Sequence, residues 1–282
     1  MAPGITLGFV RSGRTVIAPT QQLKFETSIR TQIIGERFGV LVCSFSGDHG
    51  HVAAACSMDR APALAQAVQS SLTQVCGLKP GFVHYYAKPL ENQRHLKNFA
   101  KYGLTQLDHH DDPTDRDLLG CNGPELVGGR LLRSGGWVRL PPSRRLLRER
   151  LPKLKAEEIE EWLLPVPRKS VEVLGAAPAG LVGPELEQAL VKAAATAVGR
   201  LVLEGRFPAV LKAKAALVQL VDGSPFRESV SLRRMFDCPK DTVLRLRRMS
   251  VAEPIVTAVR WQVEFQLTRR ELDRARALAA RP

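Results

Sequence analysis

A predicted β-hairpin near residue 50 places the strongest constraint on how this chain can fold. Residues 40–45 and 49–57 both have strand-like composition, and only a tight turn at Gly47-Asp48 separates them. Strands joined by so short a turn must pair antiparallel, because a parallel connection needs a crossover of about a dozen residues or more. The chain is therefore expected to contain an antiparallel sheet.

Helical and strand-like segments alternate around this hairpin. Pro19-Thr20 opens a segment of helical periodicity that Gly39 is expected to end, and residues 64–75 and 91–107 repeat the helical pattern. Residues 5–17 and 81–87 have strand character. The predicted order is β-α-β-β-α-β-α, which indicates an α+β fold with a central antiparallel sheet and helices returning to it.

Four polar side chains on two of these elements predict a site. His49 and His51, two positions apart, project from the same face of a strand, and Tyr102 and Gln106, four positions apart, share one face of a helix. Tyr102 lies off the apolar stripe of its helix, which favours a polar site at the helix–sheet boundary. These four groups can surround one divalent metal ion beside one phenol. The alternative is a surface hairpin with incidental histidines.

The charge balance favours a polyanionic partner. The chain has 41 Lys and Arg against 28 Asp and Glu, a net charge of +13 and a pI near 10.0, which suits nucleic acid or an anionic membrane surface. No apolar run is long enough for a membrane span and the N-terminus lacks a signal pattern, so we expect a soluble protein. Five cysteines without a CxxC pair argue against a disulfide framework and against structural zinc, and they fit a reducing cytoplasm.

Composition divides the chain into three expected segments. Residues 1–135 contain the sheet, residues 136–183 form a basic connector in which Pro141-Pro142 interrupts regular structure, and residues 184–282 are mainly helical. One helix is expected on each side of Gly205. A helix-turn-helix follows, with its turn around Asp237-Cys238-Pro239. A merely solvated linker is the alternative for the connector. The side chains expected to bind DNA are Arg133, Arg139, Arg144, Arg145, Arg148, Arg245, Arg247 and Arg248.

Two stretches resemble the single-tyrosine HUH transposases, in particular the REP-associated tyrosine transposases and their insertion-sequence relatives. These stretches are ERFGVLVCSFSGDHGHVAAAC and GFVHYYAKPLENQRHLKNFAKYGLTQ, and the resemblance covers roughly residues 5–125. It implies a ferredoxin/RRM-like HUH endonuclease domain in which Tyr102 is the nucleophile. It also implies that His49, His51 and Gln106 are the ligands of Mg²⁺ or Mn²⁺.

Several residues depart from the family pattern or compete with the assigned ones. Asp48 stands where Asn is usual, and Gly50 replaces a bulky apolar residue, which is expected to loosen strand packing behind the site. Gly103 follows the tyrosine at a cost of about 1 kcal/mol of helix propensity relative to Ala. Tyr85 and Tyr86 are interpreted as packing residues, with either one as an alternative nucleophile.

The resemblance implies a specific chemistry. A divalent ion polarises a non-bridging phosphate oxygen while Tyr102 attacks phosphorus, giving a 5′-phosphotyrosine and a free 3′-hydroxyl. A second 3′-hydroxyl can then rejoin the strands without ATP. The expected partner is single-stranded, hairpin-forming DNA in the bacterial cytoplasm, with no membrane association and with a homodimer left open. The alternatives are a noncatalytic DNA-binding regulator derived from such a transposase, and an HUH replication initiator or relaxase.

Overall fold

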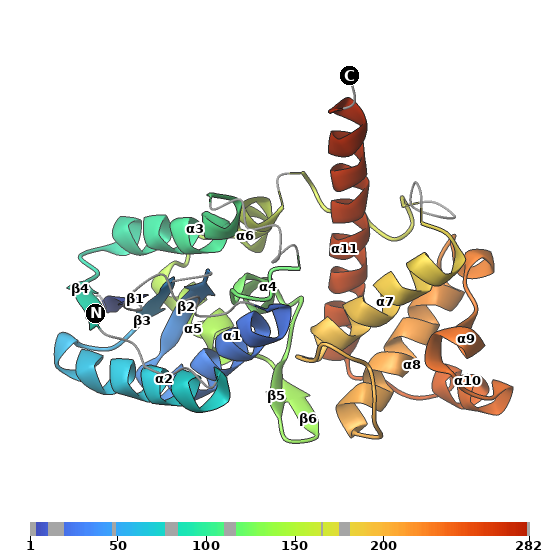
Figure 1. Cartoon of the computed structure of the whole chain (residues 1–282), viewed down its shortest axis with the longest axis horizontal. Helices are drawn as coiled ribbons and strands as arrows, with labels where there is room; N and C mark the ends of the chain where they lie inside the picture. The colour runs from blue at the N-terminus through green and yellow to red at the C-terminus, as the bar shows by residue number, and fades with distance from the viewer. Residues whose placement is uncertain are drawn as a thin grey trace. The chain divides into compact units, whose positions relative to one another are not determined.

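The chain forms two compact units. The computed structural model describes residues 4–10, 20–46, 49–76, 84–109, 117–164, 166–174 and 181–280, without the side chains of residues 9, 10, 75, 76, 84 and 106–109. One unit comprises Met1–Val127 with Pro141–Pro165, and the other comprises Gly128–Leu140 with Val166–Pro282 (Figure 1). This division differs from the three segments expected from composition, because the expected connector, residues 136–183, is divided between the two units.

A four-stranded antiparallel sheet is the centre of the first unit, as the β-hairpin predicts. The strand order is β2-β3-β1-β4, and every neighbouring pair is antiparallel. The expected hairpin is β2 and β3, with Phe45 paired to Gly50 and Ser44 paired to His51. The strands are β1 (Ile5–Val10), β2 (Val40–Phe45), β3 (His49–Ala54) and β4 (His84–Pro89).

Helices cover both faces of this sheet. The helices α1 (Gln21–Gly35) and α2 (Ala61–Cys76) lie on one face, and α3 (Gln93–His109) lies on the other (Figure 1). Short 3-10 turns, η1 (Glu36–Phe38) and η2 (Met58–Arg60), precede β2 and α2. Alternate strand residues supply the core under α1 and α2, so the other alternate set faces α3. That core includes Ile5, Leu7, Cys43, Phe45, Val52, Leu64, Val68 and Leu72.

The ends of the first helical segment follow their predicted signals. The Thr20 side chain accepts a hydrogen bond from the Leu23 backbone N–H, which satisfies one of the free donors at the start of α1. At the other end, Gly39 adopts the left-handed conformation with φ +68° and its N–H bonds to the Glu36 carbonyl. Both expected boundary residues therefore act as predicted.

Three further helices complete the first unit, and they correct the expectation for Pro141-Pro142. Pro142 is the first residue of α5, where its missing N–H costs no helical hydrogen bond. Leu147 of α5 is buried, as are Trp162 and Leu163 of α6, which packs on α3 and α4. The helices are α4 (Gly123–Val127), α5 (Pro142–Arg150) and α6 (Ala156–Leu163).

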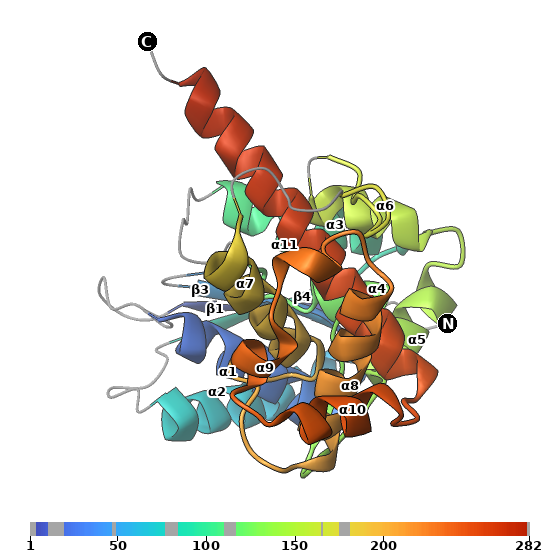
Figure 2. The same cartoon turned by 90° about the vertical axis from the view of Figure 1, so that its right-hand side faces the viewer.

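The second unit is a helical bundle with a small β-hairpin. Buried alanines and leucines of α7, α8 and α11 form its main core, while α9 packs on α7 and α10 packs on α8 (Figures 1 and 2). The expected pair of helices on either side of Gly205 is therefore present as α7 and α8. The elements are β5 (Leu132–Ser134), β6 (Trp137–Arg139), α7 (Gly183–Ala197), α8 (Pro208–Asp222), η4 (Arg227–Ser229), α9 (Leu232–Phe236), α10 (Lys240–Arg247) and α11 (Glu253–Ala279). Among the described helices, none has the length and apolar character that crossing a bilayer requires.

Candidate functional site

The two histidines of the β-hairpin project together from β3. His49 and His51 are both half-buried, and their rings lie 5.2 Å apart between centroids at an interplanar angle of 83°. They stand on the sheet face that α3 covers, since the residues between and beyond them face α1 and α2. The predicted same-face placement is confirmed, and the two rings border a common space.

Ser46 contacts the ring of His49. The sequence patterns described above do not predict this contact. Its Oγ lies 2.9 Å from Nδ1 of His49 and 3.4 Å from Nε2, and its backbone N–H donates to the His49 carbonyl at 3.0 Å. Ser46 is buried and stands at the base of the turn that joins β2 to β3. A hydroxyl three residues before a hairpin histidine is the signal that would have indicated this contact.

Gly50 does not loosen the strand behind the site, which corrects the expectation. The fully buried ring of Phe45, the cross-strand partner of Gly50, occupies the space that a side chain at position 50 would take. A Cβ atom on Gly50 would overlap this ring. The neighbouring strand thus supplies the bulky apolar group that is missing between the two histidines.

Tyr102 reaches the histidines from α3. Its ring centroid lies 5.4 Å from that of His51 at an interplanar angle of 78°, and the Phe99 ring lies 6.1 Å from His51. The side chain of Tyr102 is 45% exposed, while Ala100 and Leu104 of the same helix are buried. This arrangement confirms that the tyrosine stands at the helix–sheet boundary, open to solvent and beside His51.

The third expected metal ligand, Gln106, lies on the same helix as Tyr102. Gln106 belongs to α3, one helical turn beyond Tyr102, but its side chain lies outside the described residues, as does Asp48. Among the described residues, no group of three or more His, Cys, Asp or Glu could hold a metal ion. The expected set differs from such a group, because it combines two histidines with an amide.

The neighbouring tyrosines of β4 face opposite sides of the sheet. Tyr85 packs against the core under α1 and α2, as expected. Tyr86 is 63% exposed and shares the sheet face of His51, so its interpretation as a packing residue is wrong. Alternation along an exposed edge strand explains the difference between the two.

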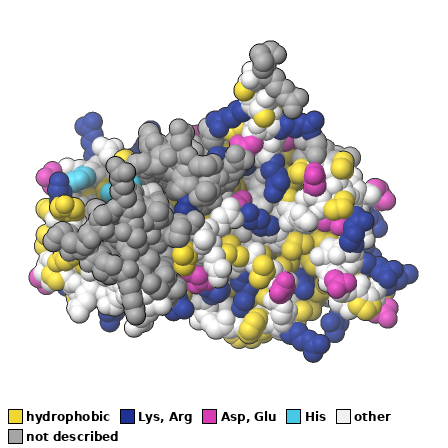
Figure 3. Space-filling model, in the orientation of Figure 1, with side chains coloured by type: hydrophobic (Ala, Val, Ile, Leu, Met, Phe, Trp, Pro, Cys, Tyr) yellow, Lys and Arg dark blue, Asp and Glu magenta, His cyan; other side chains and the backbone are white. Residues whose placement is uncertain are grey.

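The basic residues expected to bind DNA are divided between the two units. Arg144, Arg145 and Arg148 lie on α5 of the first unit, where burial and then the charge of Arg148 lower the pKa of Arg144. Arg133 and Arg139 lie on β5 and β6 of the second unit. On the face shown in Figure 3, the described Lys and Arg side chains are interspersed with Asp and Glu side chains.

The pair of short helices around Asp237 has the predicted order of helix, turn and helix. Asp237 ends α9 in the left-handed conformation with φ +45°, and α10 packs on α8 through Val243 and Leu246. Arg247 donates to Asp222 through two hydrogen bonds, of 2.6 and 2.9 Å. The guanidinium group of Arg247 is thus engaged within the protein.

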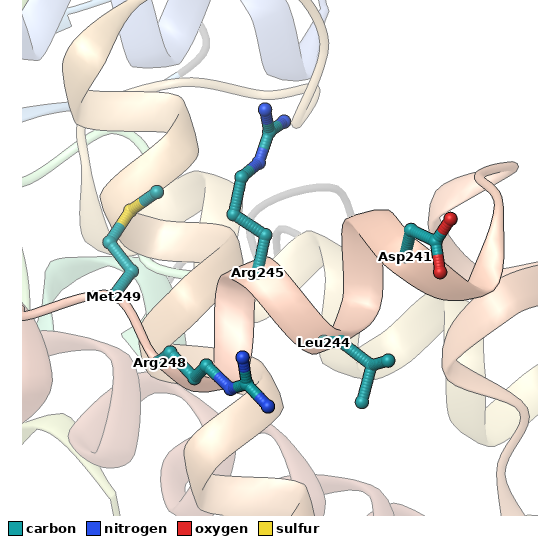
Figure 4. A pocket seen from close by; sticks show the side chains of 5 residues that line it. All are labelled: Asp241, Leu244, Arg245, Arg248 and Met249. Atoms are coloured by element: carbon teal, nitrogen blue, oxygen red, sulfur yellow. The ribbon is translucent and has the colours of Figure 1, made fainter.

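Two other arginines of this segment border a surface hollow. Arg245 and Arg248 are exposed and extend in different directions around a hollow of about 490 Å³ (Figure 4). Leu244 and Met249 supply its apolar lining and Asp241 its acidic end. Of the three arginines expected here to contact DNA, Arg247 pairs with Asp222, whereas Arg245 and Arg248 form no ion pair with the described residues.

Comparisons with known proteins give one partial likeness. No family model matches the chain, and no curated protein matches it. A solved structure of the REP-associated tyrosine transposase bound to a REP hairpin is similar over 39% of this chain and 70% of its own chain, at 15% sequence identity and a TM-score of 0.32. A likeness of this size does not establish a shared activity.

Proposed function

We propose that the first unit is a metal-dependent nuclease and strand transferase for single-stranded DNA, of the HUH type. The observation that carries this proposal is the placement of the Tyr102 ring 5.4 Å from His51, which itself lies 5.2 Å from His49. The connectivity β-α-β-β-α-β and the strand order β2-β3-β1-β4 support a ferredoxin-like assignment of the sheet.

The two histidines fit a shared divalent ion. With a metal–nitrogen bond of about 2.1 Å, an ion lies roughly 3 Å from each ring centroid, so rings at this separation can bind one ion between them. Ser46 Oγ lies nearer to Nδ1 of His49, at 2.9 Å, than to Nε2, at 3.4 Å, so we assign Nε2 to the ion. We assign Mg²⁺ or Mn²⁺ to His49, His51 and the amide oxygen of Gln106. Bound there, the ion supplies positive charge to a phosphate oxygen.

The residues of the chain perform the remaining steps. The Oη atom of Tyr102 attacks the scissile phosphorus and its proton passes to solvent, which the exposure of this side chain permits. The new Oη–P bond replaces the P–O3′ bond, and the departing 3′-oxygen takes a proton from water. Attack by a 3′-hydroxyl on the phosphotyrosine reverses these changes, releases Tyr102 and joins two strands.

Adduct formation tests this function. Purified protein with Mn²⁺ and single-stranded DNA from hairpin-forming sequences of its own genomic neighbourhood should give a covalent adduct that survives denaturing electrophoresis. Tyr102→Phe should abolish the adduct, whereas Tyr85→Phe, on the opposite face of the sheet, should retain it. Replacing either His49 or His51 by Ala should greatly reduce cleavage but leave most DNA binding, because phosphate contacts by Lys and Arg dominate affinity.

Other outcomes would reassign the function. An adduct that persists in Tyr102→Phe and disappears in Tyr86→Phe would transfer the nucleophile to β4. Tight DNA binding with no adduct on any such substrate would support the noncatalytic regulator. The exposed Arg245 and Arg248 favour a second DNA contact in either case, and we propose that α10 binds the duplex part of a DNA hairpin.

A further inference from the structure

Tyr86 is an exposed aromatic side chain on the same sheet face as the proposed catalytic site. It is 63% exposed and belongs to β4, which among the described strands pairs with β1 alone and so forms an edge of this sheet. In the register of the sheet, Gly8 of β1 pairs with His51 on one side and with Tyr86 on the other. The three residues form one row across the sheet, and their positions project to the same face.

Gly8 leaves the space between Tyr86 and His51 open. It is not among the described glycines with positive φ, so its backbone conformation does not demand glycine. Among the described residues, a Cβ atom at this position would meet only the Tyr86 side chain, at 3.9 Å from Cδ2 and 4.0 Å from Cβ, both ordinary contact distances. Neither backbone strain nor a close neighbour excludes a side chain here. The consequence of the glycine is an open strip of sheet between the two rings.

Among the described elements, the helix on this face of the sheet packs away from the strip, and one exposed lysine lies beside it. The helix α3 packs on β2 and β3, the half of the sheet that is remote from β4. Lys88, two positions along β4 from Tyr86, is exposed and shares its face, and its backbone carbonyl accepts a hydrogen bond from Thr6. The exposed Tyr86 and Lys88 thus lie two positions apart on β4, and Gly8 lies beside Tyr86 on β1.

We propose that Tyr86 is a stacking platform for a nucleobase of single-stranded DNA, and that Lys88 contacts a neighbouring phosphate. Adjacent strands lie about 4.8 Å apart, so Tyr86 stands about 10 Å from His51 across Gly8. A nucleotide next to the scissile phosphate spans such a distance with its base on Tyr86. Aromatic platforms in positively charged grooves bind single strands in this way with little sequence preference. The inference rests on the proposed function, which places the scissile phosphate at His49 and His51.

Binding without cleavage tests the platform. Anisotropy of a labelled single-stranded oligonucleotide is measured in EDTA with the Tyr102→Phe chain, so that no covalent step contributes. Adding Tyr86→Leu should weaken binding by about 5- to 100-fold, because leucine keeps apolar volume but cannot stack. Tyr86→Phe keeps the ring and is expected to keep the affinity. Gly8→Leu should also weaken binding by filling the floor, with Gly8→Ala as its matched control.

The oligonucleotide locates the stacked base. An abasic site is moved along the oligonucleotide one nucleotide at a time. At one position only, it should abolish the difference in affinity between the chain with Tyr86 and the Tyr86→Leu variant. Equal affinities of the Tyr86→Leu and Tyr86→Phe variants, with circular dichroism showing both folded, would overturn the proposal. A Tyr86→Leu effect in a protein that never forms the Tyr102 adduct would retain the platform while rejecting the nuclease, so the two failures are distinguishable.

Discussion

The Ser46 hydroxyl contacts the ring of His49 through a hydrogen bond. Its Oγ is nearer to Nδ1 of His49 than to Nε2, and its backbone N–H also bonds to the His49 carbonyl. A histidine that donates through Nδ1 presents the lone pair of Nε2 to a ligand. Under the proposed function, Ser46 is therefore a positioning residue for His49.

Removing this hydroxyl should weaken metal use but not DNA binding. For Ser46→Ala we expect cleavage to fall by about 10- to 100-fold at low Mn²⁺, the usual effect of losing a partner of a metal-binding histidine. Higher Mn²⁺ should recover part of the rate, and Ser46→Thr, which keeps a hydroxyl, should recover more. The measurement is the cleavage rate against Mn²⁺ concentration. An unchanged Mn²⁺ midpoint in Ser46→Ala would show that the contact is only structural.

At the scale of the elements, the glycines of the β-hairpin and of α3 differ in how much space surrounds them. Gly50 lies under the Phe45 ring, where a Cβ atom would overlap it, whereas a Cβ atom on Gly103 would lie 3.7 Å from Val42 Cγ1 and 3.9 Å from Ser44 Cβ. The first glycine is required by packing. The second costs helix propensity, and its described neighbours leave room for a side chain.

This contrast predicts opposite changes in stability. Gly103→Ala should raise the free energy of unfolding by about 1 kcal/mol, the difference in helix propensity. Gly50→Ala should lower it by about 1–3 kcal/mol, since the overpacked Phe45 ring must move. Urea denaturation of the two variants and of the unchanged chain measures both effects. Destabilisation by both substitutions would mean that α3 is packed more tightly than its distances indicate.

The ion pair that joins α7 to α9 should make the stability of the fold depend on pH. Burial raises the pKa of Glu187, but hydrogen bonds from Arg234 and the Ser231 N–H outweigh it and set the pKa below its ordinary value. A lowered pKa stabilises the fold above the unfolded value near 4.3, and this contribution is lost as the pH falls through the folded value. Glu187→Gln should therefore reduce the loss of stability in acid. Thermal unfolding at several pH values measures this loss. The exposed Glu185→Gln, its matched control, should not reduce it.

The arginines of α10 should separate into two roles. Arg245→Gln with Arg248→Gln should reduce the slope of log affinity against log salt by about 1.4–1.8 without changing stability, if each contributes one phosphate contact. Arg247→Gln should leave the slope unchanged and lower stability by less than about 1 kcal/mol, because its ion pair with Asp222 is partly exposed. Anisotropy titrations at several salt concentrations measure the slopes. If Arg247→Gln reduced the slope more than the paired Arg245→Gln and Arg248→Gln substitutions, this assignment would be reversed.

For the whole molecule, the order of the units along the chain decides which fragments can fold. The chain leaves the first unit after Val127, returns to it at Pro141 and leaves again after Pro165. On its return it contributes α5 and α6, whose Leu147, Ile159 and Leu163 are buried, and Lys97 of α3 pairs with Glu158 of α6. The helix that carries Tyr102 is thus supported by residues far along the chain.

A fragment that ends after Pro165 should fold, and one that ends after Arg133 should not. The shorter fragment loses α5 and α6 and exposes the surfaces of α3, α4 and β2 on which they pack. Circular dichroism should show a cooperative thermal transition for the longer fragment only. A cooperative transition at the same temperature in both fragments would show that α5 and α6 are dispensable.

The sequence alone determined the antiparallel hairpin, the helix ends at Thr20 and Gly39, and the placement of His49 and His51 on one face, because turn chemistry and the periods of strands and helices are local. The tertiary structure decided the contacts between distant segments. It placed Phe45 over Gly50, the Ser46 hydroxyl on His49, Tyr102 beside His51, and α5 and α6 in the first unit. It also left Tyr86 exposed, because α3 packs on β2 and β3. Burial depends on which surfaces meet in three dimensions, and no local pattern of residues encodes that meeting.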